Sequence, residues 1–192
     1  MRNWILGLLL VLLPVQIVAQ SSARMPDPFV PSKSQKGVRI STDVIALALP
    51  VGALTLTLVE RDWKGLLQGV ETAAATAGAT LILKYSVKEW RPDHTDRHSF
   101  PSGHSAVSFA TAAYLQRRYG WKWGAPAYAL SAYVGWGRCF SKKHHWYDVL
   151  AGAAIGAGSA YIFTRPFARN HDLQISPVTD GRNIGVYASF TL

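Results

Sequence analysis

Cysteine, methionine and charged residues are scarce in this sequence. Among its 192 residues there are one cysteine, Cys139, and two methionines, and only 16% of the residues are charged. A single cysteine excludes a disulfide bond within the chain and a zinc site built from several cysteines. Acidic residues are rarer than basic ones: the sequence has 11 Asp and Glu and 20 Lys and Arg, so the formal net charge is +9.

The excess of positive charge favours an anionic partner, which is nucleic acid, a membrane surface or a phosphorylated substrate. The sequence contains no recognised nucleic-acid-binding motif, so the last two remain. The length of 192 residues suits a single domain. A hydrophobic fraction of 49% and a mean hydropathy of +0.09 lie between those of soluble and polytopic membrane proteins.

The first part of the chain is predicted to precede the folded domain. Residues 1–19 carry one positive charge at Arg2 and then an apolar run, which indicates a secretory signal peptide or a first membrane helix. Residues 20–42 contain Pro26, Pro28 and Pro31 and show no hydrophobic period, which predicts a polar connector.

Five apolar segments follow the connector and predict an all-α fold over residues 43–165. Pro50 inside one segment and Gly152 with Gly156 in another are typical of helices that pack closely in lipid. We therefore expect a bundle of five to six transmembrane helices, counting the N-terminal segment. The shortest segments fall below the roughly 20 residues that span a bilayer, so a soluble bundle stays open. The segments are residues 43–59, 66–83, 105–115, 125–137 and 149–163.

The composition changes again in the tail, residues 166–192. Residues 173–178 and 184–190 flank the sequence Thr179-Asp180-Gly181, which predicts a short C-terminal β-hairpin. Placing residues 84–104 outside the cytoplasm gives a consistent count of membrane crossings. The polar ends of several helices then lie on one side.

The first polar group at these ends is Lys84 with Arg91, which is followed by proline. Two cations that reach one point suit a dianionic phosphoryl group, lysine as a point charge and arginine as a bidentate donor. Two unrelated surface cations are the simpler explanation of this group when it is taken alone.

The second polar group is Pro101-Ser102-Gly103-His104, at the start of an apolar segment. It offers a hydroxyl, backbone N–H groups at a helix N-terminus and a proton donor to one anion. An ordinary helix start is the simpler explanation, because Ser102 is a natural N-cap.

The third polar group contains Arg138, His144 and Asp148. On a helix, His144 and Asp148 lie on one face, so the carboxylate can accept one ring N–H and leave the other nitrogen free as a nucleophile. His145 is a rival, but its spacing to Arg138 and Asp148 fits less well. No metal site is predicted, because metal-ligand spacing is lacking around the remaining histidines: His94, His98 and His171.

Together the three groups resemble the type 2 phosphatidic acid phosphatase family, whose motifs occur in order between Lys84 and Asp148. One departure is Gly137, where many members have serine before the arginine, and it removes at most one hydroxyl from the phosphate site. The resemblance implies an all-α helical bundle with catalytic residues within 43–165. It also implies a phosphatase that needs neither a metal nor another cofactor.

By this resemblance, a lipid phosphate or diphosphate is hydrolysed in two steps through a phosphohistidine. His144 attacks phosphorus, Asp148 orients it, and His104 protonates the departing oxygen and then activates water. Five further residues are implied to hold the non-bridging oxygens: Lys84, Arg91, Ser102, Gly103 and Arg138.

We expect a multi-pass protein of the cytoplasmic membrane with its active site facing the periplasm or the outside. Its expected partners are the membrane and a phosphorylated lipid, not nucleic acid. Phosphatidic acid, phosphatidylglycerol phosphate, undecaprenyl diphosphate and the lipid A phosphates remain open as substrates, as does the oligomeric state. The alternatives are a soluble secreted acid phosphatase and, more distantly, a vanadate-dependent haloperoxidase, whose family shares these phosphate-binding motifs.

Overall fold

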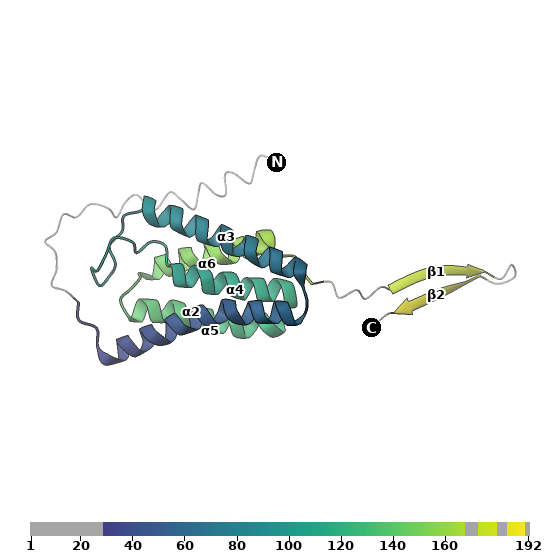
Figure 1. Cartoon of the computed structure of the whole chain (residues 1–192), viewed down its shortest axis with the longest axis horizontal. Helices are drawn as coiled ribbons and strands as arrows, with labels where there is room; N and C mark the ends of the chain where they lie inside the picture. Colours follow the sequence, from purple (N-terminus) through teal and green to yellow (C-terminus); the bar gives the residue numbers. More distant parts are fainter. Residues whose placement is uncertain (1–28, 168–172, 180–183, 191–192) are drawn as a thin grey trace.

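The computed structural model describes residues 29–167, 173–179 and 184–190. The predicted signal peptide or first membrane helix, residues 1–19, lies outside this part of the chain. Within it the five predicted helices are confirmed and lie side by side in one bundle (Figure 1). The helices are α2 (Lys33–Val59), α3 (Trp63–Ser86), α4 (Gly103–Tyr119), α5 (Trp121–Phe140) and α6 (Trp146–Phe163).

The helices are longer than the apolar segments that predicted them, because their ends are built from polar residues. Helix α2 begins at Lys33 rather than Asp43, since the Ser32 hydroxyl accepts a hydrogen bond from the Gln35 backbone N–H at 3.2 Å. The Gln35 side chain accepts in return from the Ser32 N–H at 2.9 Å. Residues 33–42 of the predicted polar connector are therefore helical, and that boundary was wrong.

Two of the helices reach the length and hydropathy of a membrane span. The five helices contain 17 to 27 residues, and α2 and α3 are long and apolar enough to cross a membrane. Only 28% and 17% of their most apolar stretches are buried, so large hydrophobic side chains face outward. Exposed apolar surface on this scale suits contact with lipid. On α2 it includes Leu47, Val51, Leu54 and Leu58.

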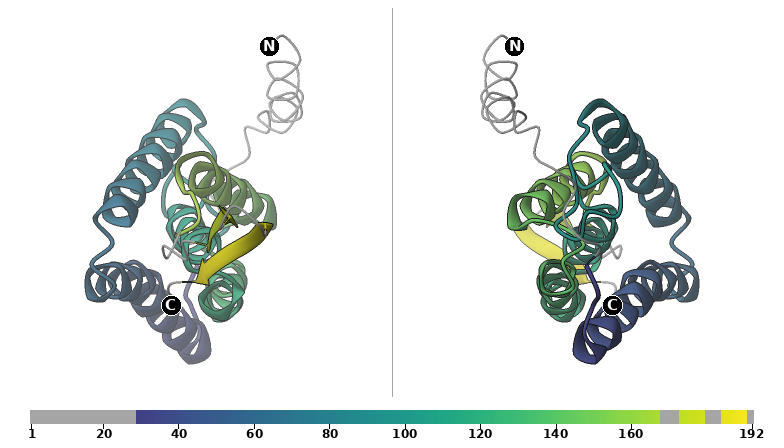
Figure 2. Two further views of the ribbon diagram at one scale, coloured as in Figure 1. Left: turned by 90° about the vertical axis from the view of Figure 1, so that its right-hand side faces the viewer. Right: turned by 90° about the vertical axis from the view of Figure 1, so that its left-hand side faces the viewer.

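Helix α4 lies in the centre of the bundle and contacts the other four helices (Figure 2). Its inward face consists mainly of small residues, since Ala106, Ala112 and Ala113 are fully buried. Small side chains allow neighbouring backbones to approach closely. The core of the bundle is therefore narrow, and the distances between helix axes depend on residues without bulky side chains.

The predicted close contact at Gly152 and Gly156 is present between α6 and α4. A Cβ atom on Gly156 would lie 2.0 Å from the carbonyl oxygen of Ala106, and one on Gly152 would lie 2.4 Å from that of Ser102. Neither position has room for a side chain. The glycines thus fix the N-terminal half of α6 against the beginning of α4, where Ser102 belongs to the predicted site.

A buried ion pair closes the end of the bundle that lies away from Ser102. Arg118 donates to both carboxylate oxygens of Asp62, at 2.5 and 2.6 Å, and the Tyr119 hydroxyl donates to the same carboxylate at 3.0 Å. Arg118 also donates to the carbonyl oxygens of Arg165 and Pro166. The start of α3, the end of α4 and the segment after α6 are therefore tied together.

Two strands follow the bundle, β1 (Leu173–Thr179) and β2 (Ile184–Phe190). They pair antiparallel, with Leu173 opposite Phe190 and Thr179 opposite Ile184. The residues predicted to form the turn, Asp180 and Gly181, lie outside the described part of the chain. The complete β-hairpin, with the turn that joins the two strands, stays a prediction.

We predict that Gly156→Ala destabilises the protein by about 1–3 kcal/mol, because the added methyl group overpacks the contact between α4 and α6. The matched control is Gly158→Ala on the same helix, where a Cβ atom would meet nothing within 4 Å. That change should be neutral or stabilise by up to about 1 kcal/mol. Equal unfolding midpoints for the two purified variants would contradict the close contact.

Candidate active site

The three polar groups converge at one end of the bundle, drawn at the left of Figure 1. Lys84 belongs to the last turn of α3, and Ser102 is the N-cap of α4. Arg138 belongs to the last turn of α5, and His144 lies between α5 and α6. The grouping of these helix ends agrees with the predicted placement of the three motifs on one side.

The loop between α3 and α4 is held by the two cations of the first motif. Lys84 Nζ donates to the carbonyl oxygens of His98 and Pro101, at 2.8 and 2.9 Å. Arg91 Nε donates to both carboxylate oxygens of Asp96, at 2.9 and 2.8 Å. Lys84 therefore supports the loop that carries the second motif, in addition to any charge that it presents to an anion.

Arg91 also reaches the third motif. One of its terminal nitrogens lies 3.3 Å from the carbonyl oxygen of Lys143 and 3.4 Å from Nε2 of His144. The neighbouring side chains of Lys143 and Asp93 form an ion pair in which both are largely buried. These contacts join the loop before α4 to the loop before α6. The Arg91 guanidinium thereby lies beside the His144 ring.

The second motif forms the N-terminus of α4. An ordinary helix start would do the same. The Ser102 hydroxyl accepts hydrogen bonds from the backbone N–H and the hydroxyl of Ser105, at 3.4 and 3.0 Å. The Ser102 backbone N–H donates to the carbonyl oxygen of Asp148 at 3.0 Å. Ser102 is fully buried, and Gly103 and His104 occupy the first turn, whose N–H groups favour anions.

His144 and Asp148 meet, although not as two residues of one helix. His144 precedes the first residue of α6, Trp146, and its Nδ1 lies 3.6 Å from Oδ2 of Asp148. This separation is within the range of an ion pair and longer than a hydrogen bond. Both side chains are buried, with 2% and 0% of their surfaces exposed.

The contacts of His144 define which nitrogen is free to react. An arginine N–H can only donate, so the contact with Arg91 requires a lone pair on His144 Nε2. The ring proton then resides on Nδ1, which faces Asp148. Nε2 is therefore the ring nitrogen that carries the lone pair.

Burial lowers the pKa of His144 below its ordinary value, and the cations Arg91 and Arg138 lower it further. Asp148 acts in the opposite direction and raises the pKa. The first effect prevails, so the net shift of the pKa is downward and the neutral ring is favoured.

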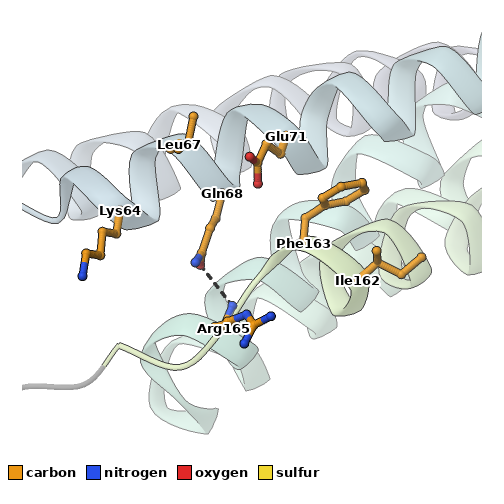
Figure 3. A pocket seen from close by; sticks show the side chains of 7 residues that line it. All are labelled: Lys64, Leu67, Gln68, Glu71, Ile162, Phe163 and Arg165. Atoms are coloured by element: carbon orange, nitrogen blue, oxygen red, sulfur yellow. Dashed lines mark hydrogen bonds between the residues drawn. The ribbon is translucent and has the colours of Figure 1, made fainter.

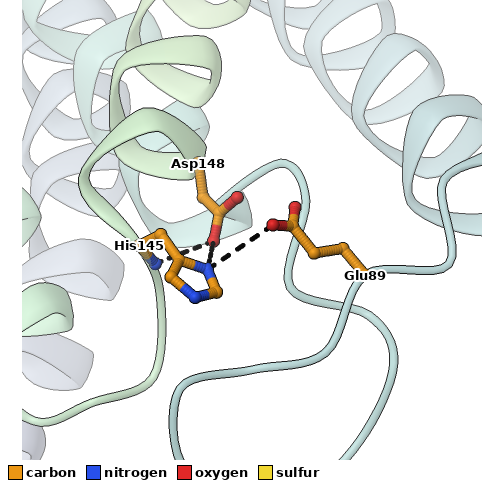
Figure 4. A group of neighbouring side chains, drawn as sticks. All are labelled: Glu89, His145 and Asp148. Atoms are coloured by element: carbon orange, nitrogen blue, oxygen red, sulfur yellow. Dashed lines mark hydrogen bonds and ion pairs between the residues drawn. The ribbon is translucent and has the colours of Figure 1, made fainter. Parts of the chain in front are cut away.

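The carboxylate of Asp148 is held mainly by residues other than His144. Its Oδ2 accepts from the Ser99 hydroxyl at 2.5 Å and from the His145 backbone N–H at 2.8 Å. His145 Nδ1 lies 3.3 Å from the same oxygen and 3.7 Å from the carboxylate of Glu89 (Figure 4). Sequence reasoning missed Ser99, because an isolated serine in a loop has no distinguishing pattern.

Glu89, His145 and Asp148 bring three potential ligand atoms within 4.8 Å of one another. Protein groups already engage these side chains, since the Tyr147 hydroxyl donates to Glu89 and the His145 ring stacks on that of Tyr147 at 4.9 Å. Hydrogen bonds, ion-pair contacts and stacking thus engage each side chain of this cluster.

Asp43 of α2 is a second residue that sequence reasoning missed. Its Oδ1 lies 2.5 Å from a terminal nitrogen of Arg138 and 3.0 Å from Nε2 of His104. In the sequence Asp43 is only the first residue of an apolar segment. The structure instead places it between one residue of the second motif and one of the third.

Gly137, the departure from the family pattern, has a packing reason. A Cβ atom at this position would lie 2.4 Å from Cγ2 of Thr42 and 2.9 Å from Cγ1 of Val38. Both residues belong to α2, and Thr42 is fully buried. A side chain at position 137 would therefore require Thr42 and Val38 of α2 to shift.

Two cavities lie outside the convergence of the three motifs. One, of about 380 Å³, is an apolar groove between α2, α3 and α4. The other, of about 340 Å³, lies where the start of α3 meets the end of α6, and the Gln68 side chain there accepts from the Arg165 N–H at 3.0 Å (Figure 3). Its lining consists of Lys64, Leu67, Gln68, Glu71, Ile162, Phe163 and Arg165.

Comparison with known proteins identifies the class of this bundle. The model of the PAP2 superfamily matches residues 65–172, which is more than half of the chain, and the chain belongs to this superfamily. It is 30% identical over 127 residues to a lipid A 4'-phosphatase of Helicobacter pylori. The aligned residues cover 60% of this chain and 64% of that protein.

A lipid A 1-phosphatase of Porphyromonas gingivalis is 38% identical over 76 residues, which cover 38% of this chain and 17% of that protein. The chain therefore spans less than two thirds of the length of either relative. The crystal structure of Aquifex aeolicus LpxE superposes with a TM-score of 0.56 and 17% identity, over 72% of this chain and 98% of that one. At this identity the likeness concerns the fold alone.

We predict that Asp148→Asn lowers the pKa of His144 further, because the change removes the negative charge that favours the imidazolium form. Arg91→Gln should raise the same pKa, because it removes a neighbouring cation. NMR titration of isotope-labelled histidine in the purified protein measures both shifts, and His144→Ala assigns the signal. Shifts of the same sign in the two variants would contradict the arrangement.

Proposed function

We propose that the protein is a lipid phosphate phosphatase that works through a phosphohistidine on His144. The observation that carries this proposal is the position of His144 Nε2, which is buried and lies 3.4 Å from the Arg91 guanidinium. A nucleophile beside a fixed cation suits attack on an anionic phosphoryl group. Membership of the PAP2 superfamily supports the same chemistry.

In the first step, Nε2 of His144 attacks phosphorus, an N–P bond forms, and the bond to the departing oxygen breaks. Asp148 stabilises the positive charge that develops on the ring, since its carboxylate faces Nδ1. His104 donates its proton to the departing oxygen. In the second step His104 takes a proton from water and the resulting hydroxide attacks phosphorus. A new O–P bond forms, the N–P bond breaks, and phosphate and free His144 are released.

The non-bridging oxygens are bound by Arg91, Arg138 and the N–H groups at the start of α4. Nε of Arg138 is buried and has no hydrogen-bond partner among the described residues, so this donor suits an oxygen of the substrate. Contacts from Lys84, Ser102 and Gly103 to phosphate are part of the proposal, and the loop contacts of Lys84 place its charge beside the second motif.

We place the site at the periplasmic or outer face of the cytoplasmic membrane, in a multi-pass protein. The two apolar helices α2 and α3 and their exposed hydrophobic side chains support the membrane. The names of the relatives from H. pylori and P. gingivalis favour a phosphate of lipid A among the substrates considered. A phosphate on a large anionic lipid also suits the net charge of +9.

Replacement of the two proposed catalytic histidines should abolish phosphate release. We expect losses of about 10⁴-fold or more for His144→Ala, which removes the nucleophile, and of about 10²–10⁴-fold for His104→Ala. His145→Ala is the matched control, because its ring supports Asp148 without facing Arg91, and it should stay within about tenfold of the wild type. Phosphate release from a lipid phosphate measures all three, and equal losses would show that the wrong histidine is assigned.

A lipid substrate should be preferred over a soluble ester. If a few methylene groups of an acyl chain bind, at about 0.8 kcal/mol each, kcat/KM should exceed that for a soluble alkyl phosphate by about 100-fold. The measurement compares phosphatidic acid, phosphatidylglycerol phosphate, undecaprenyl diphosphate and lipid A, with the His144→Ala protein as the blank. Faster hydrolysis of the soluble ester would refute the lipid part of the proposal.

A further inference from the structure

Asp43 lies between Arg138 and His104. In the proposed reaction Arg138 binds the phosphate of the substrate and His104 transfers the proton. Oδ1 of Asp43 contacts Arg138 at 2.5 Å and His104 at 3.0 Å. The Asp43 side chain is 42% exposed and that of Arg138 is 5% exposed. The carboxylate thus lies at the edge of the site and reaches a buried guanidinium and a half-buried imidazole.

The surroundings of His104 otherwise oppose its protonation. Burial is the largest effect and lowers the pKa of His104. Arg138 from α5, His144 from the loop before α6 and Arg91 from the loop after α3 lower it further. Asp43 from α2 is the acid that acts in the opposite sense. A general acid must carry its proton before the bond to the leaving group breaks.

The packing of α2 gives independent support, since it brings Asp43 to this position. Thr42 occupies the space that a side chain on residue 137 would fill, and Thr42 is fully buried. The next residue along α2 is Asp43. The absence of a side chain at Gly137 therefore lets α2 approach α5 closely enough for Asp43 to reach Arg138.

We propose that Asp43 is a positioning residue that holds the His104 ring in place and supplies a negative charge beside it when it acts as the acid for the leaving group, a role that rests on the proposed phosphatase function. The site then contains two pairs of histidine and aspartate with opposite tasks. Asp148 serves the nucleophile His144, and Asp43 serves the acid His104.

The proton follows a balanced path in this arrangement. In its imidazolium form, beside the Asp43 carboxylate, His104 gives one proton to the departing oxygen as the O–P bond breaks. The neutral ring then takes a proton from the attacking water, and the pair with Asp43 is restored. Arg138 remains able to bind the substrate, because its Nε–H has no partner among the described residues.

The leaving group provides the test. With a short-chain phosphatidate, whose alkoxide leaves poorly without a proton, Asp43→Asn should lower kcat/KM about tenfold, less than the 10²–10⁴-fold loss of a deleted acid. With para-nitrophenyl phosphate, whose phenolate leaves without a proton, the value should stay within about twofold of the wild type. Asp43→Glu should recover part of the loss, and Glu71→Gln, in the cavity at the opposite end of α3, is the control.

Two further measurements separate positioning from a general effect on structure. Asp43→Asn should shift the half-protonation of His104, followed by NMR, to lower pH by about one unit. It should add little to the loss caused by His104→Ala, because both changes act through the same proton. Equal losses with the two esters, an increase in activity, or an unchanged titration of His104 would overturn the role of Asp43.

The titration also distinguishes failure of this role from failure of the proposed function. If the wild-type protein hydrolyses neither ester, the phosphatase function fails. The shift of His104 in Asp43→Asn then decides by itself whether the two residues form a pair.

Discussion

The buried carboxylate of Asp148 is the group on which the rest of the site depends. Its side chain accepts hydrogen bonds from Ser99 and from the His145 backbone and faces the ring of His144, while its carbonyl oxygen accepts from Ser102. One residue therefore joins the loop before α4, the start of α4 and the start of α6. A buried charge held in this way is costly to disturb, since removal of one partner leaves an uncompensated group.

The close contact of α4 and α6 makes this arrangement possible. Gly152 and Gly156 bring the first turns of α6 against the backbone of α4, and Ser102 and Asp148 thereby come within hydrogen-bond distance. The backbone contact positions the helix start that we propose to face the phosphate, and the side chain of the same Asp148 faces His144, the proposed nucleophile. Helix packing and chemistry at this end of the bundle are therefore not separable.

The sequence predicted the elements that have a repeating or spaced pattern. Apolar runs identified all five described helices, and the spacing of Arg91, His104, Arg138, His144 and Asp148 identified residues that the fold brings to one end. Helix boundaries were less accurate, because capping by polar residues such as Ser32 extends a helix beyond its apolar run.

Single polar residues could not be predicted in the same way. Ser99 and Asp43 have no spacing relation to the three motifs, and their roles arise only when the loop and α2 pack against the other helices. Gly137 was interpreted as a lost hydroxyl, whereas the structure shows that it accommodates Thr42. Their functions depend on contacts between distant parts of the chain, which no local pattern records.

The position of α2 bears on what constitutes the functional unit of this chain. The superfamily match begins at residue 65, whereas α2 ends at Val59. Yet α2 fills the space beside Gly137 and supplies the only described carboxylate that contacts Arg138. A boundary drawn from the shared family region would therefore cut through the wall of the site, and α2 belongs to the same functional unit as the motifs that define the family.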